Sequence, residues 1–244
     1  MYNNPITQRN LEGLRSLGYH IMDPAEGWLA CGITGVGRLP EPEAIVDWLE
    51  SKMCSTNELE GTTILVTAGG TQESIDPVRY IGNRSSGKMG YAIAEQAARM
   101  GAKVILVSAP TSLPIPSGVD FISVDSAVSM QEAVEARYND VNVVIMAAAV
   151  SDFRVLHKAE QKIKKMESMT IELVKNPDIL QGLGSKKSHQ ILVGFAAETE
   201  HVIKYGQDKV AKKNLDMLVA NDVSKSNAGF NVDTNEGYFL YPDK

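Results

Sequence analysis

The chain has 244 residues, of which 43% are hydrophobic and 22% are charged, a composition typical of soluble globular proteins. Its length suits one large domain or two small ones with a substantial core. The formal net charge of -6 argues against a general nucleic-acid-binding protein, because contacts to phosphates need a net basic surface. No apolar run approaches the roughly 18 residues of a membrane-spanning helix, so we expect no membrane partner.

Cysteine and histidine usage limits the compartment and the metal chemistry. Cys31 and Cys54 are the only cysteines, and two thiols in a chain of this size fit a reducing cytoplasm better than a disulfide scaffold. The start, MYNNPITQRN, does not resemble a signal peptide. The four histidines form no HxxxH or HxH pair, which argues against a zinc site.

The sequence divides into two blocks. In residues 1–49, the stretch ACGITGVGR is rich in turn residues, and PEPEAIVDWLESK predicts a short helix with proline near its start. Residues 50–61 are polar and lack periodicity, which is typical of a linker. We therefore expect a first block over 1–49, a linker over 50–61 and a domain over 62–244.

Residues 62–244 alternate between strand and helix patterns. Short apolar runs rich in Val and Ile are typical of parallel strands buried on both faces; they are TILVTAGG, KVILVSAP, DFISV, VVIMAAAV, ILVGFAAET and DMLVAND. The alternation predicts an α/β fold, a Rossmann-like doubly wound and mostly parallel sheet with helices on both faces. Ligands of such folds bind at the carboxyl ends of the strands.

Three helices are predicted between these strands. The first presents one face through Met89, Ile93, Ala97 and Met100 and ends at Gly101. The second is capped by Ser126 and carries Met130 and Val134. The third runs from about Glu200 to Asn214.

A glycine-rich loop, IDPVRYIGNRSSGKMG, separates the first strand, which ends at Gly69 and Gly70, from its helix. Ser85 and Ser86 precede that helix, where free N–H groups and the macrodipole favour an anion, and Gly87 permits close backbone approach. The serines alone are explained more simply as helix caps. Asn83, Arg84 and Lys88 in the same loop make an anion site the better interpretation.

The common nucleotide motifs do not match. The chain does not enter a helix directly after the first strand, as G-x-G-x-x-G requires, and no acidic residue follows the second strand to hold a ribose. The P-loop motif is also absent. A nicotinamide-dependent enzyme is therefore a weak alternative.

Further candidate residues follow later strands, and each also has a simpler structural explanation. Asp152 can bind ribose hydroxyls or a metal, or can cap a turn. Asn176, Pro177 and Asp178 give an anion-tolerant helix start, or plain capping. The remaining candidates are cations: Lys162 in the run KIKK, which can also be a solvated face, and Lys209 and Lys213, which can clamp phosphates or complement their own helix.

These stretches together resemble the bacterial CTP-dependent phosphopantothenoylcysteine synthetases (phosphopantothenate–cysteine ligases) of coenzyme A biosynthesis. The matching motifs occur in order over residues 62–231; they are GGTQESIDPVRYIGNRSSGKMG, AAAVSDF, KIKK, VKNPDIL, GFAAET and KKNLDMLVANDVS. So many ordered matches are far more specific than a lone glycine motif. Members of this family usually continue beyond FLYPDK, so we expect the domain to be truncated at its C-terminal end.

The resemblance implies a ligase that joins 4′-phosphopantothenate to L-cysteine through an acyl-cytidylate, with Mg²⁺ accompanying CTP. It implies that Asn83 stabilises the activated acyl group and that Lys162 contacts the triphosphate from a flap. It also implies a homodimer with the substrate site near the interface. The implied CTP pocket comprises Met146, Ala147, Ala148, Asp152, Lys162, Asn176, Pro177, Asp178, Ile179, Phe195, Lys209 and Lys213, with Asp152 as a possible Mg²⁺ contact.

The first block resembles the C-terminal end of phosphopantothenoylcysteine decarboxylase, through MYNNPITQRN and GWLACGITGVGR. The resemblance makes Cys31 the acid that protonates the decarboxylated intermediate in that family. Because the flavin-binding body is missing, we expect Cys31 to be stranded, decarboxylase activity to be absent, and FMN to belong only to the full-length bifunctional protein.

Two other classes of function remain as alternatives. A nicotinamide-dependent oxidoreductase is opposed by the missing acidic residue after the second strand. A non-catalytic scaffold, serving mainly for oligomerisation, is opposed by the complete loop and the lysines.

Overall fold

The computed structural model describes the chain except for residues 1, 54–55, 166, 199–200, 223–236 and 243–244. Cys54 and Glu200, both named above from the sequence, lie outside the described residues. The chain forms two compact units, Met1–Ser55 and Thr56–Lys244.

The first unit contains two helices and a hairpin: α1 (Pro5–Ser16), β1 (Ala25–Trp28), β2 (Thr34–Arg38) and α2 (Pro42–Met53). Asn4 caps α1 by accepting a hydrogen bond from the amide of Ile6, and Pro5 occupies the first helical position. The turn-rich stretch ACGITGVGR forms most of the hairpin turn and all of β2, with Cys31 exposed in that turn. The helix predicted from PEPEAIVDWLESK is α2.

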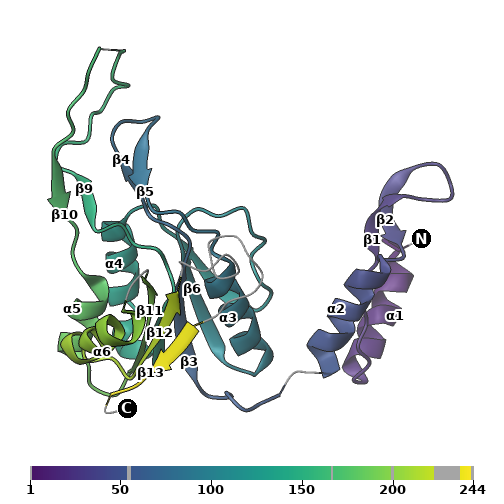
Figure 1. The fold of residues 1–244 in the computed structure, drawn as a ribbon. Helices are drawn as coiled ribbons and strands as arrows, with labels where there is room; N and C mark the ends of the chain where they lie inside the picture. Colours follow the sequence, from purple (N-terminus) through teal and green to yellow (C-terminus); the bar gives the residue numbers. More distant parts are fainter. Residues whose placement is uncertain (1, 54–55, 166, 199–200, 223–236, 243–244) are drawn as a thin grey trace. The chain divides into compact units, whose positions relative to one another are not determined.

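The second unit is organised around a seven-stranded sheet in the order β13-β12-β11-β8-β3-β6-β7 (Figure 1). Six strands are parallel, and they coincide with the six apolar runs of the sequence. The edge strand β13 is antiparallel to β12 and was not predicted. The bounds are β3 (Thr63–Ala68), β6 (Lys103–Ser108), β7 (Val119–Ser123), β8 (Val143–Met146), β11 (Ile191–Glu198), β12 (Met217–Asp222) and β13 (Gly237–Leu240).

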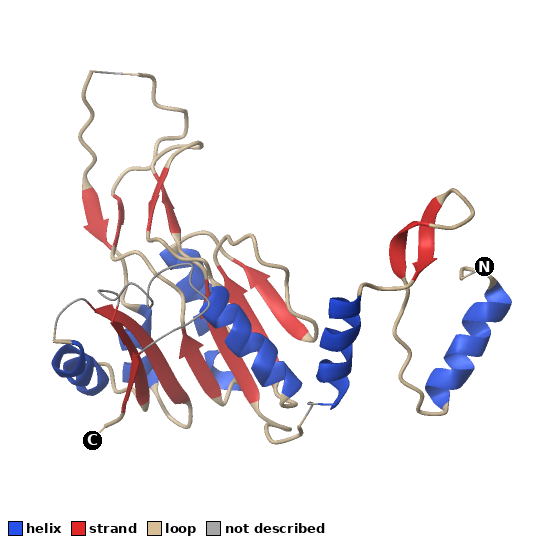
Figure 2. Cartoon of the chain, turned by 45° about the vertical axis from the view of Figure 1, so that its right-hand side comes forward, coloured by secondary structure: helices blue, strands red, loops and turns tan. Residues whose placement is uncertain are grey.

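Helices cover both faces of this sheet, which confirms the predicted doubly wound α/β class (Figure 2). One apolar cluster joins α3 (Lys88–Arg99) to side chains such as Val66 and Leu106. The other face carries α4 (Ala127–Glu135), α5 (Ile179–Lys186) and α6 (Val202–Lys212), packed on side chains such as Leu65 and Val144. Because alternate residues of one strand enter opposite clusters, the central strands are apolar throughout.

The predicted helix ends are largely correct, but one predicted face is not. Ser126 caps α4 in a capping box with Ser129, and Gly101 follows α3 in a left-handed conformation. In α3, however, Gly90, Tyr91 and Ala94 are buried together with Ala97, while Met89 is exposed. Small residues allow α3 to approach the sheet closely, and the larger Met89 side chain lies outside this contact, where it is exposed.

Two hairpins extend from the carboxyl side of the sheet (Figure 1). The first joins β4 (Gln72–Ser74) to β5 (Tyr80–Gly82), and the second joins β9 (Phe153–Val155) to β10 (Leu173–Lys175). Residues 156–172 of the second hairpin, described except for 166, are called the flap below. A short 3₁₀ turn, η1 (Tyr138–Asp140), precedes β8. Among the described residues, no helix has the length and apolarity needed to cross a membrane.

We expect Gly90→Ala to destabilise the second unit. A Cβ at this position would lie 2.6 Å from the Cβ of Ala68 and 2.8 Å from the carbonyl oxygen of Thr67, so α3 would have to move away from β3. The expected loss is about 1–3 kcal/mol in the free energy of unfolding, measured by urea denaturation.

The matched control is Gly182→Ala in α5, where nothing lies within 4 Å of the added Cβ. This variant is expected to gain up to about 1 kcal/mol, because alanine favours a helix interior over glycine. Equal stability of the two variants would contradict close packing at Gly90.

Candidate nucleotide and substrate site

A cavity of about 910 Å³ lies at the carboxyl ends of the central strands. The strand order reverses between β3 and β8, and such a switch point is where doubly wound sheets bind their ligands. Its lining comes from segments far apart in sequence: residues 83–90, Ala92, residues 146–152, residues 177–180, residues 195–197, Lys209, Lys213 and Asn221.

The loop before α3 forms one wall. Gly87, in a left-handed conformation, is the N-cap of α3, so the alternative in which Ser86 caps this helix does not hold. The Ser85 hydroxyl accepts from the Gly87 amide at 3.3 Å, and the Ser86 hydroxyl accepts from the Lys88 amide at 3.4 Å. Because the first residues of α3 line the cavity, the positive end of the helix dipole lies at this wall and favours an anion.

Gly69 and Gly70 lie behind this wall and do not line the cavity. A Cβ at Gly70 would stand 2.6 Å from the carbonyl oxygen of Asn83, and a Cβ at Gly87 would stand 3.4 Å from the Gly69 nitrogen. Because neither Gly70 nor Gly87 carries a Cβ, the loop can lie directly on the end of β3.

Asn83 connects two walls of the cavity. Its side-chain amide donates a hydrogen bond to the carbonyl oxygen of Val150 at 3.1 Å. The side chain is otherwise exposed at the cavity, where it can contact a bound molecule.

The second wall, residues 146–152, is fixed by one threonine in β3 and one that follows it. The amide of Ala148 donates to the Thr67 hydroxyl at 3.1 Å, and the amide of Ser151 donates to the Thr71 hydroxyl at 2.9 Å. Met146, Ala147 and Ala148, assigned above to the CTP pocket, line the cavity. The small side chains of Ala147 and Ala148 leave backbone groups close to any molecule that occupies the cavity.

Asn176 is buried and lies behind the lining. Its side chain donates to the Ser151 carbonyl at 2.8 Å and accepts from Arg154 at 3.1 Å, while its backbone amide donates to the Asp152 carbonyl at 2.8 Å. Asn176 thus ties the second wall to the start of α5. Pro177, Asp178 and Ile179 line the cavity directly, as does Phe195 within β11.

Asp178 forms an ion pair with Lys213, one of the lysines predicted above to bind phosphates. Its carboxylate caps α5 by accepting from the Gln181 amide at 3.0 Å, and it lies 2.9 Å from the Lys213 ammonium. Burial alone would raise the pKa of Asp178, but the hydrogen bond from Lys213 and the cap lower that pKa below its ordinary value. The resulting stability is present above the ordinary pKa and is lost as the pH falls towards the lowered one.

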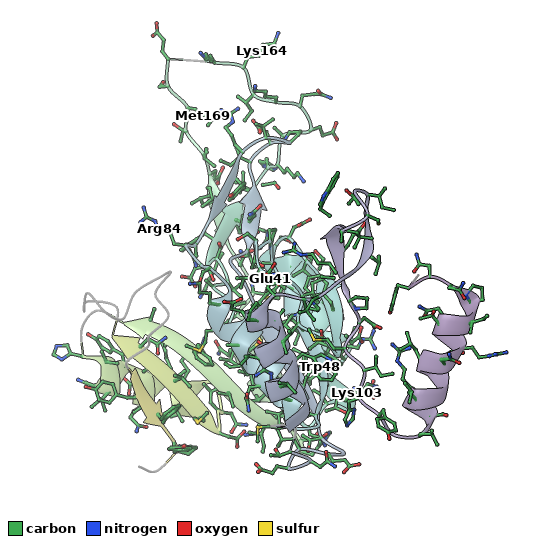
Figure 3. All side chains as sticks on the ribbon, turned by 90° about the vertical axis from the view of Figure 1, so that its right-hand side faces the viewer. Glu41, Trp48, Arg84, Lys103, Lys164 and Met169 are labelled. Atoms are coloured by element: carbon green, nitrogen blue, oxygen red, sulfur yellow. The ribbon has the colours of Figure 1, made fainter. Side chains whose placement is uncertain are left out.

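The charges around the cavity favour a polyanion. Among the described residues, four cations line it, Arg84, Lys88, Lys209 and Lys213, against the carboxylates of Asp152 and Asp178. Figure 3 shows Arg84 extending outward from its loop. Within the described part of the chain, no group of three His, Cys, Asp or Glu side chains could hold a metal by itself.

Lys162 is also a predicted site residue outside the lining, and unlike Asn176, Gly69 and Gly70 it does not lie directly behind a wall of the cavity. It is exposed on the flap and absent from the lining. Figure 3 shows the flap residues Lys164 and Met169 well apart from Arg84. Conversely, sequence reasoning missed Ser151, Leu180 and Asn221 as lining residues, although all three belong to the motifs AAAVSDF, VKNPDIL and VANDVS.

Comparisons with known proteins identify relatives of both units. Residues 59–244 match the family described as "DNA/pantothenate metabolism flavoprotein C-terminal domain", and residues 1–54 match the family described as "Flavoprotein". The coenzyme A biosynthesis bifunctional protein CoaBC of Bacillus subtilis is 50% identical over 247 residues, and that of Escherichia coli K12 is 47% identical over 248. Each alignment covers 100% of this chain but 61% of the relative.

A solved structure agrees with these matches. The crystal structure of the C-terminal domain of a CoaBC protein superimposes with a TM-score of 0.63 at 45% identity, covering 76% of this chain and 88% of that one. The chain therefore belongs to the family of DNA/pantothenate metabolism flavoprotein C-terminal domains found in CoaBC proteins, and a short flavoprotein-domain piece precedes that domain.

Proposed function

We propose that this chain is a CTP-dependent phosphopantothenate–cysteine ligase of coenzyme A biosynthesis. The observation that carries the proposal is the cavity at the switch point, which combines a helix N-terminus, four cations and Asn83. Its relatives are named for coenzyme A biosynthesis, which supports this choice of substrates. The low cysteine content supports a cytoplasmic location.

CTP would bind along the second wall. Backbone groups of Met146, Ala147 and Ala148, with residues 176–179 and Phe195, would surround the cytidine. The α3 N-terminus, Lys209 and Lys213 would hold phosphates. Asp152 fits a Mg²⁺ shared with the nucleotide, because this ion commonly uses one or two carboxylates plus substrate phosphates. Bound there, Mg²⁺ would neutralise phosphate charge.

The reaction has two steps. The carboxylate of 4′-phosphopantothenate attacks the α-phosphorus of CTP, forming an acyl-cytidylate and releasing pyrophosphate. The amine of cysteine then attacks the acyl carbon, an amide forms, and CMP leaves. Neither step needs a protein nucleophile, so the chain contributes positioning and charge stabilisation. Asn83 would hydrogen-bond the activated acyl group, and Lys162 would contact the triphosphate.

The function is tested by measuring pyrophosphate release with CTP, Mg²⁺ and 4′-phosphopantothenate, with and without cysteine, using ATP as the control nucleotide. CTP-selective release supports the proposal. Binding of NADH in place of CTP would favour the oxidoreductase alternative, and binding of neither would favour a scaffold.

Two variants separate the steps. Asn83→Asp is expected to release pyrophosphate yet form little amide, because it loses the donor to the acyl group and adds a repelling charge. Lys162→Gln is expected to slow pyrophosphate release itself. Equal loss of both steps in Asn83→Asp would exclude a specific role of Asn83 in the second step. Normal CTP turnover in Lys162→Gln would exclude Lys162 from the site.

We further propose that the chain forms a homodimer through its two hairpins. Both hairpins carry exposed apolar side chains, and the hairpins contact each other through β4 and β9; these side chains are Val78, Tyr80, Phe153, Leu156 and Leu173. Val78 is 61% and Tyr80 55% exposed, and exposed apolar surface of this kind supports an interaction site. Pairing of two copies would bury this surface close to the cavity.

Tyr80→Arg is expected to shift the chain from dimer to monomer in sedimentation velocity, because an arginine would bring like charges together across a two-fold interface. The matched control is Ile203→Arg on α6, at a side chain that is 52% exposed and away from the hairpins. A Tyr80→Arg chain that sediments like the wild type would exclude this interface.

A further inference from the structure

One buried carboxylate outside the cavity joins the first hairpin to the flap. The side chain of Asp76, in the turn between β4 and β5, is fully buried. Its two oxygens have different partners. Oδ1 accepts from the amides of Val78 and Arg79, both at 2.8 Å, which shapes the turn. Oδ2 accepts from the Arg79 guanidinium, with Nε at 3.0 Å, and from the Ile163 amide at 3.1 Å.

Arg79 completes the connection from the other side. Its Nη2 atom donates to the carbonyl oxygen of Ile163 at 2.8 Å while pairing with Asp76. Both backbone polar groups of Ile163 are therefore held by one ion pair. The hydrogen bonds to Asp76, foremost the one from the Arg79 side chain, keep the pKa of Asp76 well below its usual range. The Asp76–Arg79 pair, called the anchor below, is therefore charged at neutral pH.

Ile163 adjoins Lys162, the flap lysine assigned to the triphosphate. Elsewhere on the described flap, the backbone hydrogen bonds are Leu156 to Glu172 and Ala159 to Ile75, near its base. Ile163 is thus held further along the flap than these residues. An exposed lysine on a free segment would lose both backbone and side-chain entropy on binding, whereas a backbone already held at the neighbouring residue has less entropy to lose.

We propose that Asp76, with Arg79, is a positioning residue that fixes the flap backbone at Ile163 so that Lys162 can act on the triphosphate. This inference rests on the proposed ligase function. A simpler role in shaping the turn accounts for the partners of Oδ1 but not for those of Oδ2. The two oxygens therefore allow the turn and the anchor to be tested separately.

The first test needs no nucleotide. Amide hydrogen exchange is followed by NMR in the wild type, in Asp76→Asn and in the matched control Asp120→Asn, whose carboxylate is exposed on β7. Asparagine offers one acceptor oxygen, so it cannot serve both the turn and Ile163. Exchange at Ile163 is expected to rise about tenfold or more in Asp76→Asn, with a smaller change at Ala159. Unchanged exchange at Ile163 would overturn the anchor.

The second test is a double-mutant cycle on CTP-dependent pyrophosphate release. Asp76→Asn is expected to slow release about tenfold or more while leaving CMP binding unchanged, because CMP lacks the outer phosphates. If Asp76 acts through Lys162, then adding Asp76→Asn to Lys162→Gln produces little further loss. Additive losses would overturn the positioning role.

A variant on the flap covers the case in which Asp76→Asn unfolds the hairpin. Ile163→Pro removes the amide donor and leaves the Asp76–Arg79 pair intact, and Ile163→Ala keeps the donor. Ile163→Pro is expected to release pyrophosphate more slowly than Ile163→Ala, and equal release rates would contradict the proposal. Absence of CTP turnover in the wild type would refute the ligase function, while the exchange result at Ile163 would still decide the anchor.

Discussion

The site depends on the pairing of β3 with β8, two strands that are adjacent in the sheet but about 80 residues apart in sequence. The chain moves outward from β3 through β6 and β7 and then returns to β8, so the loops beyond β3 and β8 diverge to opposite sides. The ladder continues past the strand ends, where Gly70 bridges Ala149. This pairing sets the spacing between the loop of Asn83 and the wall of Met146 to Asp152.

Much of the fold could be predicted because its signals are local. A buried parallel strand must be apolar on both faces, so the runs VVIMAAAV and KVILVSAP indicate strands. Ser126 likewise indicates the start of α4, because serine is a favoured N-cap residue. The edge strand β13 carries exposed aromatic residues and depends on pairing with β12, so its own sequence does not indicate a buried strand. The buried face of α3 was misjudged because close packing selected glycine and alanine over Met89.

For the candidate site, the sequence indicates which residues to consider but not how they are arranged. Motif order assigned Asn83, Asp152, Asp178 and Lys213 to the site, and the structure places all four around one cavity. It could not show that Asn176 lies behind the lining or that Lys213 already pairs with Asp178, because both facts depend on contacts between distant segments. The position of Lys162 also depends on such a contact, through the hydrogen bonds of Ile163 with Asp76 and Arg79.

The Asp178–Lys213 pair gives the cavity an internal counter-ion. A phosphate that engages Lys213 must compete with a carboxylate already in place, so part of its attraction is offset by breaking that pair. Departure of such a phosphate would let the pair re-form and replace the contact that is lost. Binding and release would then exchange one ion pair for another, which favours turnover over very tight retention of the nucleotide.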